Sequence, residues 1–345
     1  VEAFLLFLAY LFFIQRMTRK TSLVNWCFSL AIGMFLLFIA TASFAQQSPQ
    51  FSIFSANSNI VNPAFSGWKT NNYVALQIRD QWSGYSTSND GSGTLGTTWL
   101  SGSFGISSKG GLGLQFYSDK TPSGVSQQLI QFQGAYHLKK GDGLWSFGLS
   151  AGLQTKAFDG RAFRVRDPND PVAILVSGSA VSQTQPDFGF GAVYSTDSWQ
   201  LGVTADHLTA PQFDFNGGTA SMPLDRVFAM HGSAEISLSD YFDLLPYALV
   251  RYYSGQIVPE GGARVYYNKL IYAGAAYRNG DAAMGLVGVS ILQNKLDIGY
   301  SMDITTSNAL NKKPLSHEVF LRFRIPERTI RQKPAPIRTP RFRIL

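Results

Sequence analysis

The stretch Gly143-Leu-Trp-Ser-Phe-Gly-Leu-Ser-Ala-Gly-Leu-Gln154 separates its side chains into two contrasting sets. Every second residue from Trp145 to Leu153 is apolar, whereas the alternate residues from Ser146 to Gln154 are small or polar. Successive side chains of a β-strand point to opposite faces, so a strand here has a bulky apolar face and a small, polar face. Strands of transmembrane β-barrels have this pattern, with apolar groups toward lipid and polar groups toward the lumen. A soluble antiparallel sheet has it too, and a pair of β-sandwiches is therefore the alternative.

The composition favours the barrel. The small, polar face recurs along the chain, and little else in the sequence supplies a second hydrophobic layer. The 345 residues include 33 glycines, 26 phenylalanines and 15 tyrosines, and only 15% are charged. Many strands, tight turns and aromatic girdles account for these numbers, and a large barrel takes this length as one unit. We therefore expect an all-β fold, a transmembrane antiparallel β-barrel.

The same alternation recurs often enough to close a barrel over residues 73–325. About fourteen strands are expected, which agrees with the even strand number of bacterial barrels. With an even number, both ends of the barrel segment should face the periplasm. The expected strands are 73–79, 93–105, 112–117, 130–138, 143–154, 188–194, 200–208, 226–238, 245–253, 262–267, 270–278, 284–292, 295–303 and 317–325.

Residues 1–45 are interpreted as an upstream extension followed by a secretory signal peptide. Met17-Thr-Arg-Lys20 is typical of a start methionine with a basic n-region, an apolar run follows, and Ser43-Phe44-Ala45 is a small-x-small cleavage site. Cleavage is therefore expected after Ala45, and residues 1–16 are interpreted as an over-extension of the reading frame. One or two transmembrane helices are the alternative, because 23–45 is long enough to span a bilayer.

The only cysteine, Cys27, falls within this leader. The mature chain would then contain no thiol, which excludes disulfides, thiolate catalysis and cysteine-based metal sites. The four histidines are scattered without the spacing of a metal site, and no residue is marked as a nucleophile. The sequence therefore predicts a non-enzymatic protein with no catalytic residues, no metal and no cofactor. A hydrolase site assembled from separate strands is the less favoured alternative.

Residues 46–72, between the leader and the first strand, are polar and rich in Asn and Ser. Pro63 biases Asn62 away from helix, and Gly67 allows a turn. An ordered plug segment is expected here rather than a strand, tucked into the periplasmic mouth of the barrel.

A long connection, 158–185, interrupts the rhythm of the strands and is placed outside the cell, where such barrels have their long loops. Together with charges expected in the lumen, its arginines could build a ligand-selective constriction. Pairing across the lumen, or holding a plug, is the favoured role. The loop candidates for partner binding are Arg161, Arg164 and Arg166. The expected lumen charges are Arg79, Asp80, Arg322 and Arg324.

The formal net charge of +7 comes from the two ends of the chain, because residues 46–325 carry equal numbers of acidic and basic side chains. The Pro-rich tail 326–345 cannot bury a core and is expected to be an extended arm. Behind a signal peptide it would meet no nucleic acid, so its candidate partners are a periplasmic protein, peptidoglycan or an anionic lipid surface. A tail without a partner is the alternative. Its candidate partner-binding residues are Arg328, Arg331, Lys333, Arg338, Arg341 and Arg343.

Eight short motifs stand in order along residues 46–325. The motifs are Gln46-Gln47-x-Pro49-Gln50-Phe51, Asn62-Pro63-Ala64-Phe65-x-Gly67, Arg79-Asp80-Gln81-Trp82-x-Gly84, Pro186-Asp187-Phe188-Gly189-Phe190-Gly191, Gly202-Val203-x-x-x-His207-Leu208, Ala276-Tyr277-Arg278, Ile298-Gly299-Tyr300-x-x-Asp303 and Ser316-His317-Glu318. In this order they resemble the PorP/SprF family. The motif residues taken as candidate structural sites are Asn62, Pro63, Gly67, Arg79, Gln81, Trp82, Asp187, Gly189, Gly191, Tyr300, Asp303, His317 and Glu318.

The resemblance implies an outer-membrane barrel of the type IX secretion system of Bacteroidota, linked in many members to gliding motility. Some members look like partners of secreted cargo with a C-terminal secretion domain, often adhesins, and others look like parts of the machinery near its periplasmic ring. The implied partners are therefore the C-terminal domain of a cargo protein, other machinery components reached through the basic tail, and outer-membrane lipid. The tail 326–345 departs from the family, whose members commonly end close to the last strand.

The leading hypothesis is a non-enzymatic outer-membrane barrel, with both termini in the periplasm, that anchors type IX cargo or assists its export. A barrel of this size has a lumen too narrow for a folded adhesin, which favours a binding role. A FadL-like channel for small hydrophobic ligands, gated by the Asn62-Pro63-Ala64 segment, is the alternative. A purely structural barrel that fixes the machinery to the envelope is the third hypothesis.

Overall fold

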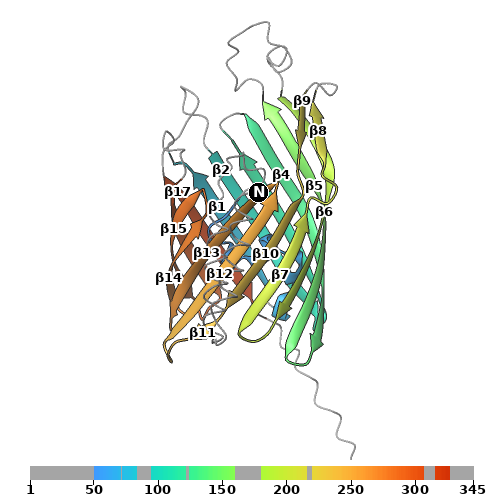
Figure 1. Cartoon of the computed structure of the whole chain (residues 1–345). Coiled ribbons are helices and arrows are strands. Elements are labelled where there is room, and N and C mark those ends of the chain that lie inside the picture. The colour runs from blue at the N-terminus through green and yellow to red at the C-terminus, as the bar shows by residue number, and fades with distance from the viewer. Residues whose placement is uncertain are drawn as a thin grey trace, which may run out of the picture. The chain divides into compact units, whose positions relative to one another are not determined.

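The alternating stretches pair into one sheet that closes on itself (Figure 1). The computed structural model describes residues 50–70, 72–83, 95–121, 124–159, 180–215, 220–306 and 315–326. The leader 1–45, the loop residues Arg161, Arg164 and Arg166, and the basic residues of the tail lie outside these ranges. What the sequence predicts for them therefore stays a prediction.

Fourteen antiparallel strands form the wall of the barrel. Each pairs with the next wall strand along the chain, and the pairing of β1 with β17 closes the circle. The predicted all-β barrel of about fourteen strands is confirmed, and each expected strand overlaps one wall strand. The wall strands are β1 (Asn72–Gln81), β2 (Leu95–Ser107), β3 (Gly110–Lys120), β4 (Val125–Lys140), β5 (Gly143–Asp159), β6 (Ala180–Ser195), β7 (Trp199–Asp206), β10 (Val227–Ala234), β12 (Phe242–Tyr253), β13 (Gln256–Tyr267), β14 (Ile271–Arg278), β15 (Ala282–Ile291), β16 (Leu296–Thr305) and β17 (Leu315–Ile325).

The two ends of the barrel are named here after the first wall strand. The Asn72 end is where β1 begins and β17 ends, and the Gln81 end is where β1 ends and β17 begins. Near the Asn72 end, β11 (Ile236–Ser237) continues the pairing along β12. At the Gln81 end, β8 (Gln212–Phe215) and β9 (Ala220–Pro223) form a hairpin beside β6, at the top of Figure 1.

The connection expected at 158–185 is shorter than predicted. β5 continues to Asp159 and β6 begins at Ala180, so Phe158 pairs with Val181 across the two strands. The polar residues here look like a loop in the sequence, but the backbone groups form the ladder whatever the side chains are. Gln183 of β6 also links the wall to the hairpin, because its side chain accepts a hydrogen bond from the backbone N–H of Asp214 in β8.

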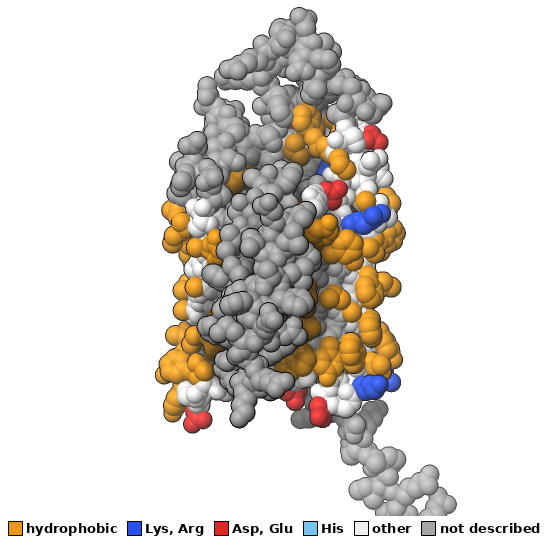
Figure 2. All heavy atoms as spheres, in the orientation of Figure 1, with side chains coloured by type: hydrophobic (Ala, Val, Ile, Leu, Met, Phe, Trp, Pro, Cys, Tyr) orange, Lys and Arg blue, Asp and Glu red, His pale blue; other side chains and the backbone are white. Residues whose placement is uncertain are grey.

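Side chains alternate between the two faces of the wall as the sequence predicts. In β5, Phe147 and Leu149 are 42% and 65% exposed, whereas Ser146 and Ser150 are buried. Figure 2 shows hydrophobic side chains covering the visible wall and charged side chains gathered toward its two ends. An outward apolar belt between polar ends is what a lipid bilayer requires of a barrel.

Asp80 does not face the lumen, contrary to the prediction. It shares the outward face of β1 with Val74 and Ile78, whereas Arg79 points inward and is buried. Neighbouring residues of a regular strand cannot share a face, so Arg79 and Asp80 could not both be lumen charges. Of the other expected lumen charges, Arg322 reaches the backbone of residues inside the lumen, with Nη1 2.6 Å from the carbonyl oxygen of Ala56.

Residues 50–70, called the inner segment here, lie inside the lumen. The segment starts near the Gln81 end, where Gln50 Nε2 lies 3.4 Å from the hydroxyl of Tyr253, the last residue of β12. It finishes at the Asn72 end, where Lys69 Nζ lies 3.4 Å from the carbonyl oxygen of Thr196. The segment therefore extends along the lumen from one end to the other instead of lying in one mouth only. Its predicted position at the periplasmic mouth stays a prediction.

Short 3₁₀ turns give the inner segment its shape. They are η1 (Phe54–Ala56), η2 (Ser58–Ile60), η3 (Pro63–Phe65) and η4 (Trp68–Thr70). Apolar side chains of the segment pack on apolar islands of the inner wall, as Phe51 does on Trp99 with ring centroids 5.5 Å apart. Within the described ranges, no helix has the length and apolar character needed to cross a membrane.

Candidate functional site

A buried charge cluster lies on three neighbouring wall strands. Arg79 of β1 stands opposite Glu318 of β17, and Asp303 comes from β16 on the other side of β17. Arg79 Nη1 lies 2.6 Å from Asp303 Oδ2 and 3.3 Å from Glu318 Oε2. All three side chains are almost completely excluded from solvent. The structure therefore brings together three of the motif residues that the sequence singled out.

This charge cluster holds the start of the inner segment. Glu318 accepts hydrogen bonds from the backbone N–H groups of Ser52 (2.8 Å) and Ile53 (2.9 Å). The Ser52 hydroxyl donates to Asp303 Oδ2 at 2.6 Å. Buried charges are tolerated when they are paired and hydrogen-bonded. The inner segment thus supplies hydrogen bonds that the two carboxylates need, and the carboxylates anchor the segment.

A second charge cluster lies on β12, β13 and β14, a few strands further round the wall. Glu260 Oε2 of β13 is 2.7 Å from Arg278 Nε of β14 and 3.7 Å from Arg251 Nη1 of β12. Arg278 Nη2 also donates to the backbone carbonyl of Phe51 at 3.3 Å. Arg278 belongs to a motif, but the sequence analysis missed Arg251 and Glu260. The available signal was weak: Arg251 is a charged residue within an otherwise apolar expected strand.

Asn62 and Pro63 set the bend in the middle of the inner segment. Asn62 Oδ1 accepts the backbone N–H of Ala64 at 2.9 Å, as an N-cap does, and Pro63 occupies the first position of η3. Asn62 Nδ2 lies 3.3 Å from the carbonyl oxygen of Ala192 in β6 and 3.0 Å from that of Val203 in β7. This motif therefore shapes the turn and also ties it to the wall.

Glycines allow the inner segment to approach the wall closely. A Cβ at Gly191 would lie 2.0 Å from Asn62 Oδ1, and a Cβ at Gly148 would lie 2.3 Å from the backbone nitrogen of Ala64. Gly67 has a φ of +64°, and a Cβ there would meet the Cα of Gly111 at 2.5 Å. The small residues that the sequence places on the inner face of the strands thus make room for the inner segment.

Gly191→Ala is expected to lower the free energy of unfolding by about 1–3 kcal/mol, because overpacking a filled interior forces neighbouring groups to shift. The measurement is urea unfolding in lipid vesicles, followed by tryptophan fluorescence. Gly134→Ala is the matched control, because a Cβ at Gly134 would meet nothing within 4 Å, and it should change the free energy by less than about 0.5 kcal/mol. Equal losses in the two variants would contradict the close contact at Gly191.

Asp187 and His207 form a third polar contact inside the barrel. His207 Nδ1 lies 2.7 Å from Asp187 Oδ2, and His207 has a φ of +56° just after β7 ends. A Cβ at Gly189 would lie 2.5 Å from Ser150 Oγ and 2.7 Å from Asp206 Oδ1. The motif around Asp187 therefore forms tightly packed polar contacts with the residues at the end of β7.

Four motif residues lie apart from the inner segment. Tyr300 and His317 lie on the outward face, with the hydroxyl 2.7 Å from Nδ1, so His317 and Glu318 face opposite sides as predicted. Gln81 ends β1 opposite Leu95, and Trp82 follows with a φ of +52°. These residues shape the outer surface and the rim of the wall.

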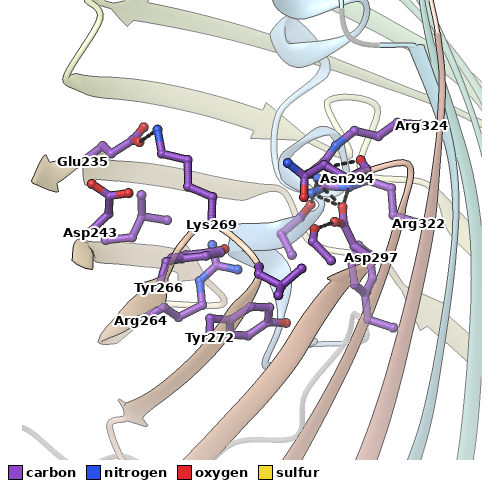
Figure 3. Close-up of a pocket in the computed structure, with 15 residues that line it drawn as sticks. Glu235, Asp243, Arg264, Tyr266, Lys269, Tyr272, Asn294, Asp297, Arg322 and Arg324 are labelled. Carbon is purple, nitrogen blue, oxygen red and sulfur yellow. Dashed lines mark hydrogen bonds and ion pairs between the residues drawn. The ribbon is translucent and has the colours of Figure 1, made fainter. Parts of the chain in front are cut away.

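Over the described ranges, no three or more His, Cys, Asp or Glu side chains are grouped so that they could hold a metal ion. Two cavities flank the inner segment near the Asn72 end, of about 290 and 360 Å³, and both are bordered by Ala56, Arg322 and Arg324. Figure 3 shows the first of them.

Solved barrels resemble this fold at low sequence identity. The crystal structure of a Pseudomonas aeruginosa FadL homologue has a TM-score of 0.42 and 13% identity, over 76% of this chain and 91% of that chain. The CymD monoaromatic hydrocarbon channel has a TM-score of 0.43 and 12% identity, over 78% and 91% of the two chains. The translocator domain of the autotransporter NalP from Neisseria meningitidis has a TM-score of 0.36 and 13% identity, over 74% and 89%. No curated protein matches the sequence.

The family comparison covers most of the sequence. The profile of the type IX secretion system membrane protein PorP/SprF matches residues 43–323. That range contains the inner segment, nearly the whole barrel wall and the motif residues that bind the two together. The chain therefore belongs to the PorP/SprF family of type IX secretion system membrane proteins.

Proposed function

We propose that this outer-membrane barrel is a non-enzymatic component of the type IX secretion and gliding machinery, which binds cargo and partner proteins at its two ends. The observation that supports this most directly is the inner segment in the lumen. It is bonded to strands all around the wall: Ser52 reaches β16, the Ser66 hydroxyl donates to Gln133 of β4 at 2.9 Å, and the Gly67 N–H donates to Ser103 of β2 at 2.8 Å. A lumen shared with its own chain is unsuited to passing a folded adhesin.

The orientation is part of the proposal. The four longest connections between wall strands, 82–94, 160–179, 207–226 and 306–314, all join strands at the Gln81 end. Bacterial barrels have short turns on the periplasmic side and longer loops outside the cell. The Gln81 end should therefore face outward and the Asn72 end should face the periplasm, where the tail 326–345 leaves the barrel.

The two ends then have different partners. Outside the cell, Arg161, Arg164 and Arg166 in the 160–179 connection are the proposed contacts for the C-terminal domain of a cargo protein. In the periplasm, the six basic residues of the tail are the proposed contacts for other machinery components. Basic side chains offer charge-assisted hydrogen bonds to acidic partners, and such bonds are stronger than neutral ones.

Mass spectrometry of the complexes extracted from native outer membranes in mild detergent should recover a large secreted protein with a C-terminal secretion domain. Removing 162–177, which leaves β5 and β6 intact, should sharply lower recovery of that cargo, because it removes Arg164 and Arg166, two of the three proposed contacts. Removing 327–345 is the matched control, and it should lose periplasmic proteins while keeping the cargo. Unchanged cargo recovery without 162–177, from a barrel that still assembles, would contradict the assignment of the loop.

The FadL-like channel is the competing function. It requires room in the lumen for a small hydrophobic ligand. The two cavities of about 290 and 360 Å³ are bordered by charged side chains, among them Arg322 and Arg324. The cavity bordered by Trp99, Tyr117 and the inner segment, which is the more apolar one, measures about 100 Å³. Pockets for small molecules are usually about 300–1,000 Å³, so the space disfavours this function. Recovery of the barrel alone, with a bound lipid-like ligand, would favour the channel instead.

A further inference from the structure

A cavity of about 290 Å³ opens near the Asn72 end, between the inner segment and the wall from β12 to β17. Figure 3 shows charged and tyrosine side chains converging on this space from two sides. Ala56 is the contribution of the inner segment, and the other lining residues belong to the wall and its turns. The side chains point into the lumen, so the wall separates the cavity from the bilayer.

One side of the cavity carries an excess of positive charge. Arg322 Nη2 and Arg324 Nη2 lie 2.7 and 2.8 Å from the same atom, Oδ2 of Asp297. One carboxylate balances only one of the two guanidinium charges. Arg324 also donates from Nη1 to the carbonyl of Asn294 at 2.5 Å, and its side chain is 37% exposed. A ligand entering the cavity can therefore reach Arg324.

Arg264 of β13 lies across the cavity from Arg322 and Arg324 (Figure 3). Its side chain is buried, with the guanidinium carbon 5.3 Å from the ring centre of Tyr272 and 5.5 Å from that of Tyr266. Cations are attracted to the faces of aromatic rings, so the tyrosines hold the guanidinium in place. With Phe320, they also provide an aromatic surface beside the charges.

The side on which Arg264 lies also carries acidic groups. Lys269 Nζ lies 3.8 Å from Glu235 Oε1, and Asp243 accepts a hydrogen bond from the Ser237 hydroxyl at 2.7 Å. Two acidic and two basic residues line this side, so it offers no excess positive charge to a ligand with several negative charges. A ligand with one carboxylate followed by neutral or cationic groups matches both sides, and peptides have this composition.

We propose that this cavity binds a peptide segment through a carboxylate, which Arg322 and Arg324 receive while the tyrosines pack against the adjoining residues. Planar guanidinium groups match the geometry of a carboxylate. The volume is close to that of the smallest ligand pockets, so the cavity takes a few residues rather than a domain. The cavity faces the periplasm in the orientation proposed above, and the location of the peptide's parent protein rests on that proposal. Peptide binding to the cavity does not depend on the orientation.

The test is isothermal titration calorimetry of the full chain in mild detergent with the blocked peptide acetyl-Leu-Glu-Ala-Lys-amide. Arg324→Gln should weaken binding at least about tenfold, because a charge-assisted hydrogen bond contributes about 1.5–3 kcal/mol. Lys295→Gln is the matched control: it removes one positive charge at the same end, outside the cavity lining, and should leave binding unchanged. The same peptide with Gln in place of Glu should not bind.

Asp297→Asn provides a gain of binding that misfolding cannot mimic. Removing the carboxylate that Arg322 and Arg324 share should tighten binding of the Glu peptide. No binding of the Glu peptide to the intact chain, equal binding of the Gln peptide, or equal effects of Arg324→Gln and Lys295→Gln would each overturn the proposal. Inorganic phosphate that binds while the Glu peptide does not would overturn the carboxylate in favour of a phosphate ligand. These results are independent of whether a cargo protein co-purifies.

Discussion

Removing residues 50–70 is expected to turn the closed barrel into an open, conducting pore. The segment lies along the lumen from Gln50, beside Tyr253, to Lys69, beside Thr196. Without it, the polar side chains and glycines of the inner wall, with apolar islands such as the one around Trp99, would face water. Conducting barrels have polar, water-filled interiors. Single-channel recording in planar bilayers should show discrete steps for the deletion variant and the membrane baseline for the intact chain.

Two controls make this recording decisive. Gly134→Ala leaves the inner segment in place, and its current should stay at the membrane baseline. That result would show that insertion of a barrel variant does not by itself produce an open pore. Heat-modifiable migration on gels shows whether the deletion variant has formed a barrel. A barrel that forms without residues 50–70 and still remains at the baseline would refute the segment as the element that closes the lumen.

Arg79→Met is expected to lower the free energy of unfolding by about 3–5 kcal/mol, the usual cost of breaking a buried ion pair by removing one partner. The change leaves Asp303 and Glu318 buried without their shared cation. It also weakens the anchor of Ser52 and Ile53, which depends on those carboxylates. Urea unfolding in lipid vesicles measures the difference.

A triple variant separates charge imbalance from lost packing. Arg79→Met combined with Asp303→Asn and Glu318→Gln removes all three charges, and neutral replacements of a whole buried ion cluster are often tolerated. The triple variant should therefore recover much of the stability that the single variant loses. A loss below about 1 kcal/mol for Arg79→Met alone would mean that the cluster is solvated, contrary to its burial.

The arrangement of the wall could be predicted because strand periodicity is local. In β5, the alternation of Phe147 and Leu149 with Ser146 and Ser150 determines which groups face lipid, and nothing elsewhere in the chain can change that parity. The same parity predicted that His317 and Glu318 face opposite sides. It also excluded Asp80 from the lumen once Arg79 pointed inward, a consequence that the sequence analysis overlooked.

The limits of the strands were harder to predict. Polar residues such as Gln183 resemble a loop, but they continue β6 because strand pairing depends on backbone groups. The ion-pair partners of the charged residues in the lumen could not be predicted from the sequence either. Glu260 and Arg278 are close in sequence, but Arg79 and Glu318 meet only because the last wall strand pairs with the first.

The transmembrane barrel of about fourteen strands, the two faces of each strand and the family could be predicted from the sequence, because those features depend on local periodicity and ordered motifs. The fold was needed to show that residues 50–70 extend along the lumen, that Gly191 and Gly148 make room for Asn62 and Ala64, and that Arg322 and Arg324 share Asp297. These contacts join residues far apart in the chain, and the closure of the sheet brings them together.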